Sequence, residues 1–419
     1  MTSLLLCFAA MLLLAVLVSS LAHRTVLSTA ALFLVGGFLL GDGVTDVISL
    51  QPGDELVAGL AELALFAVLF TDGMHAGWQD LRSAWRLPGR ALGWGLPLTL
   101  LVTAVLARYV VGLGWVESLL IGAILAPTDP VFAAALVGND KVPPRLRHLL
   151  NVESGVNDGL ALPFVVLFLA IAQGEDDLHL GELGTELAGG VAIGVAIPWV
   201  AIMLERTRWF AIAPKYEPLN AVAIGLLVLA TAQATHGNLF LAAFAAGVTV
   251  ATIGRDHREA FEEFGELLAE LLKLAALLVF GALLSPAFLG DVGWTGWVFA
   301  VLALVIARPV AIWVSFLGSR LTAREQAAVM WFGPKGFASV VYGLLVLEAG
   351  IAVGEEIFHL VGVTIMLSIL AHSSTDIVVA RGFDDEREVP AWFGRARTLV
   401  RRPDRAAPPD DTAGPKHPE

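Results

Sequence analysis

The 419-residue sequence is poor in charge and in cysteine. Asp, Glu, Lys and Arg together make up 16% of it, whereas an average soluble protein has about 25%. Hydrophobic residues make up 57% of the chain. The single cysteine, Cys7, excludes an intrachain disulfide. The sequence also has no phosphate-binding loop, no nucleophile–base pattern and no metal-site spacing of His and Cys, which argues against a soluble enzyme and against a membrane-embedded hydrolase.

Long apolar runs recur along almost the whole chain. Each has about 20 residues, the length that a helix needs to cross a bilayer. The first run has no basic n-region and no small-residue cleavage site, so we interpret it as a transmembrane helix rather than a signal peptide. The pattern predicts an all-α membrane protein of about 13 transmembrane helices. The predicted ranges are 4–21, 26–41, 55–74, 90–111, 115–137, 149–172, 184–204, 217–235, 238–254, 262–285, 294–317, 324–347 and 354–379.

Basic residues divide the loops into two sets. One set holds nearly all loop Lys and Arg, while the opposite set is acidic and contains only Arg108. The positive-inside rule then places the N-terminus outside and the C-terminus in the cytoplasm. We expect the protein in the plasma or inner membrane of the cell. Residues 384–419 are rich in Pro, Asp and Arg, which predicts a short disordered cytoplasmic tail.

An acidic residue interrupts the apolar range 115–137. The segment Thr128-Asp129-Pro130 follows Pro127, so two prolines stand three residues apart. Proline removes a backbone donor and leaves a carbonyl unpaired, and such broken helices form ion sites in transporters. A carboxylate at the bilayer centre costs about 3 kcal/mol on insertion scales, so it usually marks an ion path. The alternative is a proline kink beside a buried, protonated Asp129.

The range 149–172 carries a second polar group. Ser154 and Asp158 are four residues apart and share a helix face, while Glu153 and Asn157 share the neighbouring face. One face therefore offers a hydroxyl and a carboxylate to a cation. The alternative is that Asp158 only pairs with a basic residue within the membrane.

Three basic residues lie within predicted spans. Arg308 needs a buried partner, for which we expect Glu153. Lys335 lies in Gly333-Pro334-Lys335-Gly336, a second interrupted span, and the two interruptions suggest inverted repeats whose broken helices cross. Lys335 would offset helix-end carbonyls or Asp129, or else snorkel to the membrane surface.

The remaining charged positions give weaker signals. Asp72 lies near the end of its span and either lines an inner funnel or is solvated. Glu263, Glu266, Glu270 and Lys273 form a stripe at helical spacing, which we interpret as mainly a solvated face with a local Glu270–Lys273 pair.

The Thr128-Asp129-Pro130 break, the stretch from Glu153 to Gly159, Arg308-Pro309 and the Gly-Pro-Lys-Gly segment together resemble the NhaP-type sodium/proton antiporters. These belong to the monovalent cation:proton antiporter superfamily. The resemblance covers all the predicted spans. Family members often have Arg where Lys335 stands and an acid at or beside Thr71, so this sequence departs from the family at both places and leaves Asp72 as a weak candidate.

The resemblance implies an antiporter fold with core helices in 90–172 and 294–380, interface helices in 1–74 and 217–285, and a linking helix at 184–204. It also implies a homodimer. Asp158 would bind the cation and carry the proton, with Asp129, Ser154 and the Thr128 carbonyl as further Na⁺ ligands. Asn157 beside Asp158 resembles the electroneutral branch of the family.

Secondary-active exchange of a monovalent cation, Na⁺ first, for protons is thus the leading hypothesis. Cation and proton would compete for Asp158 during alternating access. A K⁺/H⁺ antiporter on the same scaffold, a cation channel without proton coupling and a membrane sensor are the alternatives. We expect the lipid bilayer and a second copy of the chain as partners, and neither a cofactor nor a nucleic acid.

Overall fold

The computed structural model describes residues 2–22, 28–76, 87–129, 142–174, 180–207, 209–210, 212–254 and 258–383. Helices make up nearly all of these ranges, and no strand occurs within them. The predicted tail, residues 384–419, lies outside the described part, as do Pro130 and the rest of the predicted range 115–137 beyond it. The all-α prediction is confirmed for the residues that are described.

The described residues form a succession of helices. In chain order they are α1 (Thr2–Ala22), α2 (Thr29–Leu40), α3 (Glu55–His75), α5 (Pro88–Arg90), the π-helical turn η1 (Ala91–Gly95), α6 (Leu96–Leu106), the π-helical turn η2 (Ala107–Val111), α7 (Trp115–Leu125), α9 (Pro144–Ala172), α10 (Leu180–Glu205), the 3₁₀ turn η4 (Pro214–Tyr216), α11 (Glu217–Thr235), α12 (Leu239–Ile253), α13 (Arg258–Leu283), α14 (Pro286–Asp291), α15 (Trp294–Leu302), the π-helical turn η5 (Ala303–Ala307), α16 (Arg308–Ser315), α17 (Ala323–Trp331), α18 (Phe337–Glu348) and α19 (Gly354–Arg381).

Helix ends coincide with capping residues. The Ser28 hydroxyl accepts a hydrogen bond from the Ala31 amide at the start of α2, and Asn238 does the same for Leu241 at the start of α12. These side chains satisfy donors that have no partner within the helix. α11 ends at Thr235, and His236 directly after it adopts a left-handed conformation (φ 54°). The His236-Gly237-Asn238 break therefore acts as the turn between two antiparallel helices.

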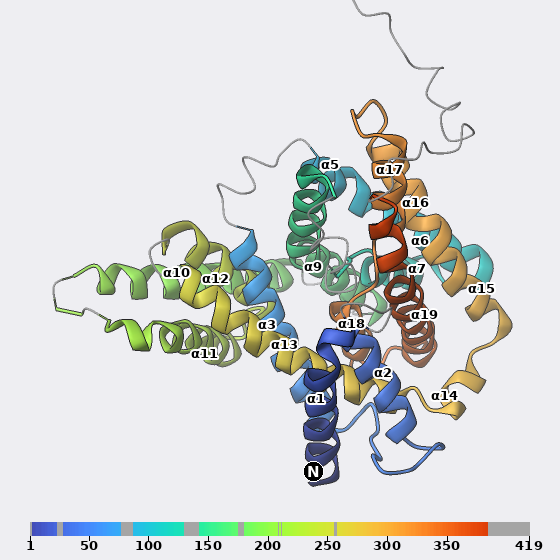
Figure 1. The fold of residues 1–419 in the computed structure, drawn as a ribbon, viewed down its shortest axis with the longest axis horizontal. Helices are drawn as coiled ribbons and strands as arrows, with labels where there is room; N and C mark the ends of the chain where they lie inside the picture. Colours follow the sequence, from blue (N-terminus) through green and yellow to red (C-terminus); the bar gives the residue numbers. More distant parts are fainter. Residues whose placement is uncertain are drawn as a thin grey trace, which may run out of the picture.

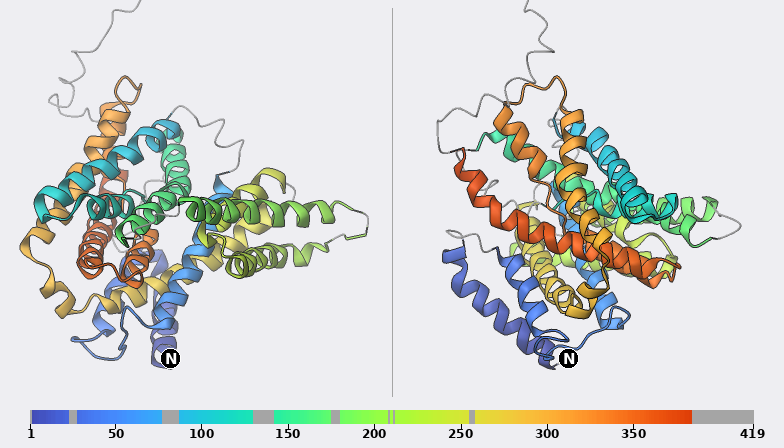
Figure 2. Two further views of the ribbon diagram at one scale, coloured as in Figure 1. Left: turned by 180° about the vertical axis from the view of Figure 1, so that it is seen from behind. Right: turned by 90° about the vertical axis from the view of Figure 1, so that its right-hand side faces the viewer.

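Helices α3, α12 and α13 lie side by side in the middle of the molecule (Figure 1). α10 and α11 extend from them to one side, and α6, α15, α16 and α19 lie on the other side, with α9 and α18 between the groups (Figures 1 and 2). Gly73 and Gly247 allow the close crossing of α3 and α12, because a Cβ on Gly247 would clash with the Phe70 carbonyl and one on Gly73 with the Phe244 carbonyl. This crossing holds the end of α3 that bears Asp72.

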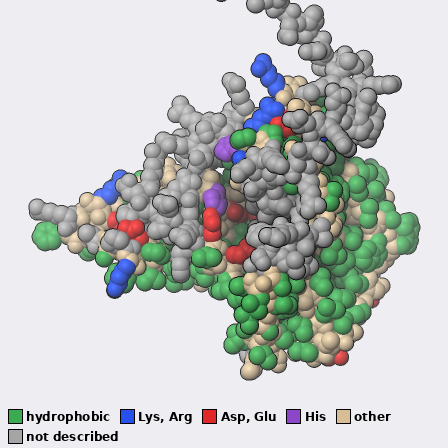
Figure 3. Space-filling view, in the orientation of Figure 1, with side chains coloured by type: hydrophobic (Ala, Val, Ile, Leu, Met, Phe, Trp, Pro, Cys, Tyr) green, Lys and Arg blue, Asp and Glu red, His purple; other side chains and the backbone are tan. Residues whose placement is uncertain are grey.

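The outer surface is largely apolar. Large hydrophobic side chains such as Leu17, Tyr109 and Trp294 are more than two-thirds exposed, and Figure 3 shows hydrophobic atoms over much of the visible surface. Soluble monomers rarely expose apolar areas of this extent. In the same view, acidic and histidine side chains gather near the middle of the face. The apolar exterior fits a lipid environment.

Seven helices of the described ranges are long and apolar enough to cross a membrane, and five shorter helices are apolar. The predicted range 217–235 coincides with α11, whereas α9 begins at Pro144, five residues before the predicted 149. The range 324–347 consists of two helices, α17 and α18, separated by residues 332–336. The chain is thus a multi-pass membrane protein, while the count of about 13 spans and the inverted repeats stay predictions.

Candidate functional site

Two interrupted helices meet near the centre of the molecule. α7 ends at Leu125 and the chain is not helical from there to Asp129, while α17 ends at Trp331 and α18 begins only at Phe337. Pro127 and Pro334 cannot donate the backbone hydrogen bond that would continue either helix. Instead, the Asp129 amide donates to the Pro334 carbonyl at 2.9 Å. The two breaks therefore cross and are joined by a backbone hydrogen bond.

The charges at this crossing match the helix ends. The Lys335 ammonium lies 3.5 Å from the Pro127 carbonyl, just past the C-terminal end of α7, and Asp129 Oδ2 lies 3.5 Å from the Phe337 amide at the N-terminal end of α18. A cation at a C-terminus and an anion at an N-terminus are the arrangement that the helix dipole favours. Lys335 is 1% exposed, so it does not snorkel. Gly336 is required here, because a Cβ would clash with Asp129.

One face of α9 lies against the α7 break. Asn157 Nδ2 donates to the Thr128 hydroxyl at 2.7 Å, and the Ser154 and Thr128 hydroxyl oxygens are 3.4 Å apart. All three side chains are buried. The Asn157 amide oxygen is also buried and has no hydrogen-bond partner among the described residues. Polar atoms of this kind are normally paired in a protein interior, so this cluster holds oxygen atoms that a cation could use.

Asp158 lies on the same face of α9 and is 6% exposed. Its backbone carbonyl accepts a hydrogen bond from the Tyr342 hydroxyl of α18 at 3.0 Å. Within the described part of the chain its carboxyl group has no hydrogen-bonding or ion-pair partner, although Asp129, Lys273 and Lys335 are near enough to interact with it electrostatically. Asp158 is thus a buried acid without a fixed partner, rather than half of an ion pair.

Glu153 and Arg308 form the ion pair that the sequence suggested. Arg308 Nη1 and Nη2 donate to the two carboxylate oxygens at 2.7 and 3.1 Å, and both side chains are 5% exposed. Arg308 Nη2 also donates to the Phe332 carbonyl at 2.9 Å. Bidentate pairing of this kind satisfies both charges away from water. The pair connects α9, α16 and the end of α17.

Asp72 of α3 is partly buried and lies near the same acids. The backbone carbonyl of Asp72 is 3.7 Å from the position that a Cβ on Gly155 of α9 would take, so the two helices touch at this turn. Electrostatic interactions link Asp72 with Asp129 and Asp158. The structure therefore places the weakest candidate of the sequence analysis beside the principal ones.

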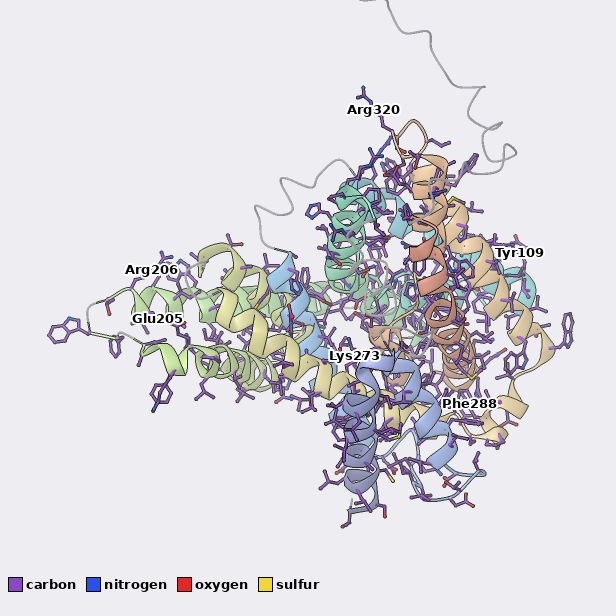
Figure 4. All side chains as sticks on the ribbon, in the orientation of Figure 1. Tyr109, Glu205, Arg206, Lys273, Phe288 and Arg320 are labelled. Carbon is purple, nitrogen blue, oxygen red and sulfur yellow. The ribbon has the colours of Figure 1, made fainter. Side chains whose placement is uncertain are left out.

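The prediction of a solvated acidic stripe on α13 is wrong for Lys273. This residue is 6% exposed and lies at the centre of the molecule (Figure 4). The expected local pair is present, with Lys273 Nζ 2.8 Å from Glu270 Oε2. The side chain of Glu263 lies outside the described residues, while Glu266 pairs with His75 of α3. The sequence pattern identified which residues share the helix face but not whether that face is buried. Charges at helical spacing occur both on solvated faces and on faces that line a cavity.

Other polar residues were missed by the sequence analysis. The Ser339 hydroxyl donates to the Ile124 carbonyl at 2.6 Å, and the Ser368 hydroxyl accepts from the Lys335 amide at 2.7 Å. Both therefore satisfy backbone groups released by the helix breaks. A signal existed for the second, because Thr364, Ser368 and His372 repeat every four residues on the apolar helix α19.

Residues 10–381 match the family model described as "Sodium/hydrogen exchanger, transmembrane". The K(+)/H(+) antiporter NhaP2 of Shewanella oneidensis is 26% identical over 387 residues, which cover 87% of this chain and 64% of the relative. A probable Na(+)/H(+) antiporter of Schizosaccharomyces pombe is 26% identical over 333 residues, covering 73% of this chain and 43% of the relative. The chain thus spans less than two-thirds of the length of these curated relatives.

The fold has a counterpart among solved structures. The sodium proton antiporter MjNhaP1 of Methanocaldococcus jannaschii superposes with a TM-score of 0.74 at 17% identity, covering 91% of this chain and 98% of MjNhaP1. A second structure of the same protein superposes with a TM-score of 0.69. The family match covers most of the chain and agrees with this fold, so the protein belongs to the sodium/hydrogen exchanger family of transmembrane proteins.

Proposed function

We propose that the protein is a secondary-active antiporter that exchanges a monovalent cation for protons. The observation that carries this proposal is Asp158, a buried carboxyl group beside the crossing of two broken helices that has no hydrogen-bond or ion-pair partner among the described residues. Intramembrane acids of this kind mark ion and proton paths. The names of the curated relatives, which are cation/proton antiporters, support the same reaction.

The proposed binding site combines Asp158 with the oxygens around it. Thr128 and Ser154 bring hydroxyl groups within 3.4 Å of each other, and the Asn157 amide oxygen is unpaired. Asp129 would contribute charge to the site while anchored at the start of α18. Oxygen donors of this type suit alkali cations, whose affinity depends on cavity size and ligand number. When Na⁺ or K⁺ enters the site, these oxygen atoms would take the place of the water molecules of its hydration shell.

Exchange follows from competition at Asp158. One carboxylate binds either a proton or a cation, so binding of one lowers the affinity for the other. Alternating access then carries each substrate in turn when the helices around the crossing move relative to α3, α12 and α13. The ion pair of Glu153 and Arg308 would hold the helices around the crossing together during this movement, because each charge already has its partner within that group of helices.

Na⁺ is the cation that we propose first, as in the name of MjNhaP1. K⁺ is the second candidate, supported by the K(+)/H(+) antiporter names of the NhaP2 relatives. The N-terminus would lie outside and the C-terminus in the cytoplasm, and the transporter would act as a homodimer. The loop charges support the orientation.

The test uses purified full-length protein in proteoliposomes with an imposed pH gradient and a pH-sensitive dye inside. Addition of NaCl, KCl, LiCl or choline chloride should dissipate the gradient for the transported ion only. Asp158→Asn should abolish this exchange and leave the protein folded, whereas Asp291→Asn, at an exposed acid of α14, should exchange normally. An Asp158→Asn protein that exchanges near the wild-type rate would overturn the site assignment, and cation flux without proton movement would indicate a channel.

A further inference from the structure

Lys273 is a buried lysine in a helix of a membrane protein. Such residues are costly in hydrocarbon and are retained where they pair or line a path. Its side chain is 7% exposed, while those of Glu270 and Glu266, on the preceding turns of α13, are 38% and 54% exposed. The charged stripe therefore runs from the surface to the interior and ends at Lys273.

The surroundings of Lys273 are the acids of the proposed site. Its ammonium pairs with Glu270 at 2.8 Å and interacts electrostatically with Asp72, Asp129 and Asp158. These three carboxylates come from three other elements: α3, the break after α7, and α9. Lys273 thus brings a positive charge from α13 to the place where a transported cation would have to bind.

Beyond Lys273, α13 becomes entirely apolar. Ala276, Val279, Phe280 and Leu283 pack against α3 and against the start of α18, leaving a cavity of only about 10 Å³. This is no larger than the space that one water molecule needs. Lys273 is therefore the last charged group of α13 before a closely packed apolar contact. It stands at the buried end of the charged stripe.

We propose that Lys273 is a tethered competitor of the transported cation, and that its pairing with Glu270 sets the affinity of the site. The inference rests on the proposed function and adds a residue that lies on neither broken helix. A fixed positive charge near the carboxylates weakens cation binding, and a negative partner partly offsets that charge. A site that must release its ion on each cycle benefits from such moderation, because conduction and transport both need binding weak enough to reverse.

The two members of the pair have opposite effects on affinity. Lys273→Gln removes the competing charge and should lower the KM for the cation by about tenfold, the size of effect that one unit charge has on a neighbouring one at an effective dielectric constant of about 20. Glu270→Gln leaves the ammonium unopposed and should raise the KM. The rise should be smaller, because Glu270 is 38% exposed and its charge is screened by water.

The experiment measures the KM and maximal rate of cation-driven proton movement in proteoliposomes at one fixed pH for wild type, Lys273→Gln, Lys273→Arg, Glu270→Gln and the double variant. Lys273→Arg keeps the charge and should stay within about twofold of wild type. Glu266→Gln serves as the control on the same helix, because Glu266 pairs with His75 instead. A second readout, the cation concentration that half-saturates thermal stabilisation of the purified protein, follows binding without transport.

Opposite shifts of KM in the two single variants, matched by the binding readout, are the expected result. A merely structural pair would lower stability and maximal rate in both variants and leave the KM values unchanged or shifted in one direction, which would overturn the inference. If wild type itself moves no protons against a cation, the proposed function fails instead. The binding readout still decides on Lys273 in that case, since an unaltered half-saturating concentration in Lys273→Gln would refute its competing role.

Discussion

Glu153→Gln should destabilise the protein by about 3 kcal/mol, the lower end of the range for breaking a buried ion pair. The carboxylate oxygens of Glu153 accept from Arg308 at 2.7 and 3.1 Å, and both side chains are 5% exposed. Glutamine retains one acceptor but removes the charge. The guanidinium then stays buried with only neutral acceptors, the glutamine oxygen and the Phe332 carbonyl, and its charge has lost the carboxylate that offset it.

A matched control lies elsewhere in the chain. Glu325 accepts from Arg145 Nε and Nη2 at 2.7 and 2.6 Å, so its pairing is also bidentate. Arg145, however, is 48% exposed, and water can solvate its guanidinium once the carboxylate is gone. Glu325→Gln should therefore cost only about 1 kcal/mol, as for pairs with access to solvent. The contrast tests the solvent access of the arginine, since both carboxylates pair bidentately. Glu325 also accepts from the Thr322 amide at 2.7 Å, a bond that the glutamine oxygen can keep.

The assay is equilibrium unfolding of the purified variants in mixed micelles, followed by tryptophan fluorescence. In a double-mutant cycle, removing Arg308 after Glu153 should add little further loss, because residues of one pair are not additive. If Glu153→Gln loses no more stability than Glu325→Gln, the argument from burial is refuted. If it is as stable as wild type but cannot exchange, Glu153 belongs among the ion ligands instead.

Two further predictions concern the crossing and the stoichiometry. Gly336→Ala should lower the free energy of unfolding by about 1–3 kcal/mol and reduce exchange, because the added Cβ would clash with Asp129. Gly290→Ala is the control, because a Cβ there meets no atom within 4 Å, and it should be neutral. Thermal unfolding and the proteoliposome assay measure both variants. Exchange should be electroneutral, so a valinomycin-imposed membrane potential should leave the rate unchanged, because in the proposed mechanism Asp158 alone carries both substrates in turn. A rate that rises steeply with potential would show that a second group, such as Lys335, also loads and releases protons.

Much of the site was predictable because helix periodicity and proline chemistry are local. Prolines and glycines at 127 and at 333–336 predicted where two helices stop. The four-residue spacing of Ser154 and Asp158 placed them on one face, and the cost of a lone Arg308 required an acidic partner. The ion pair with Glu153 is present in the structure. The roles of these residues in binding an ion remain part of the proposal.

The depth of a helix face was not predictable in the same way. Glu266, Glu270 and Lys273 have the same helical spacing whether the face meets water or an internal cavity. Likewise, Ser339 and Ser368 read as ordinary small polar residues until the carbonyl of Ile124 and the amide of Lys335 are seen beside them. Their function depends on which backbone groups the breaks leave unpaired.

The sequence by itself determined that this is an α-helical membrane protein, where its helices break, and which of its acids share a helix face. These properties depend on hydropathy, on proline and on a period of about 3.6 residues, all of which act within one segment. Only the tertiary structure decided that Asp129 anchors to Pro334 and the start of α18, that Asp72 approaches α9, and that Lys273 faces the acids. Each of those relations joins segments far apart in the chain, and a local pattern carries no information about what packs opposite it.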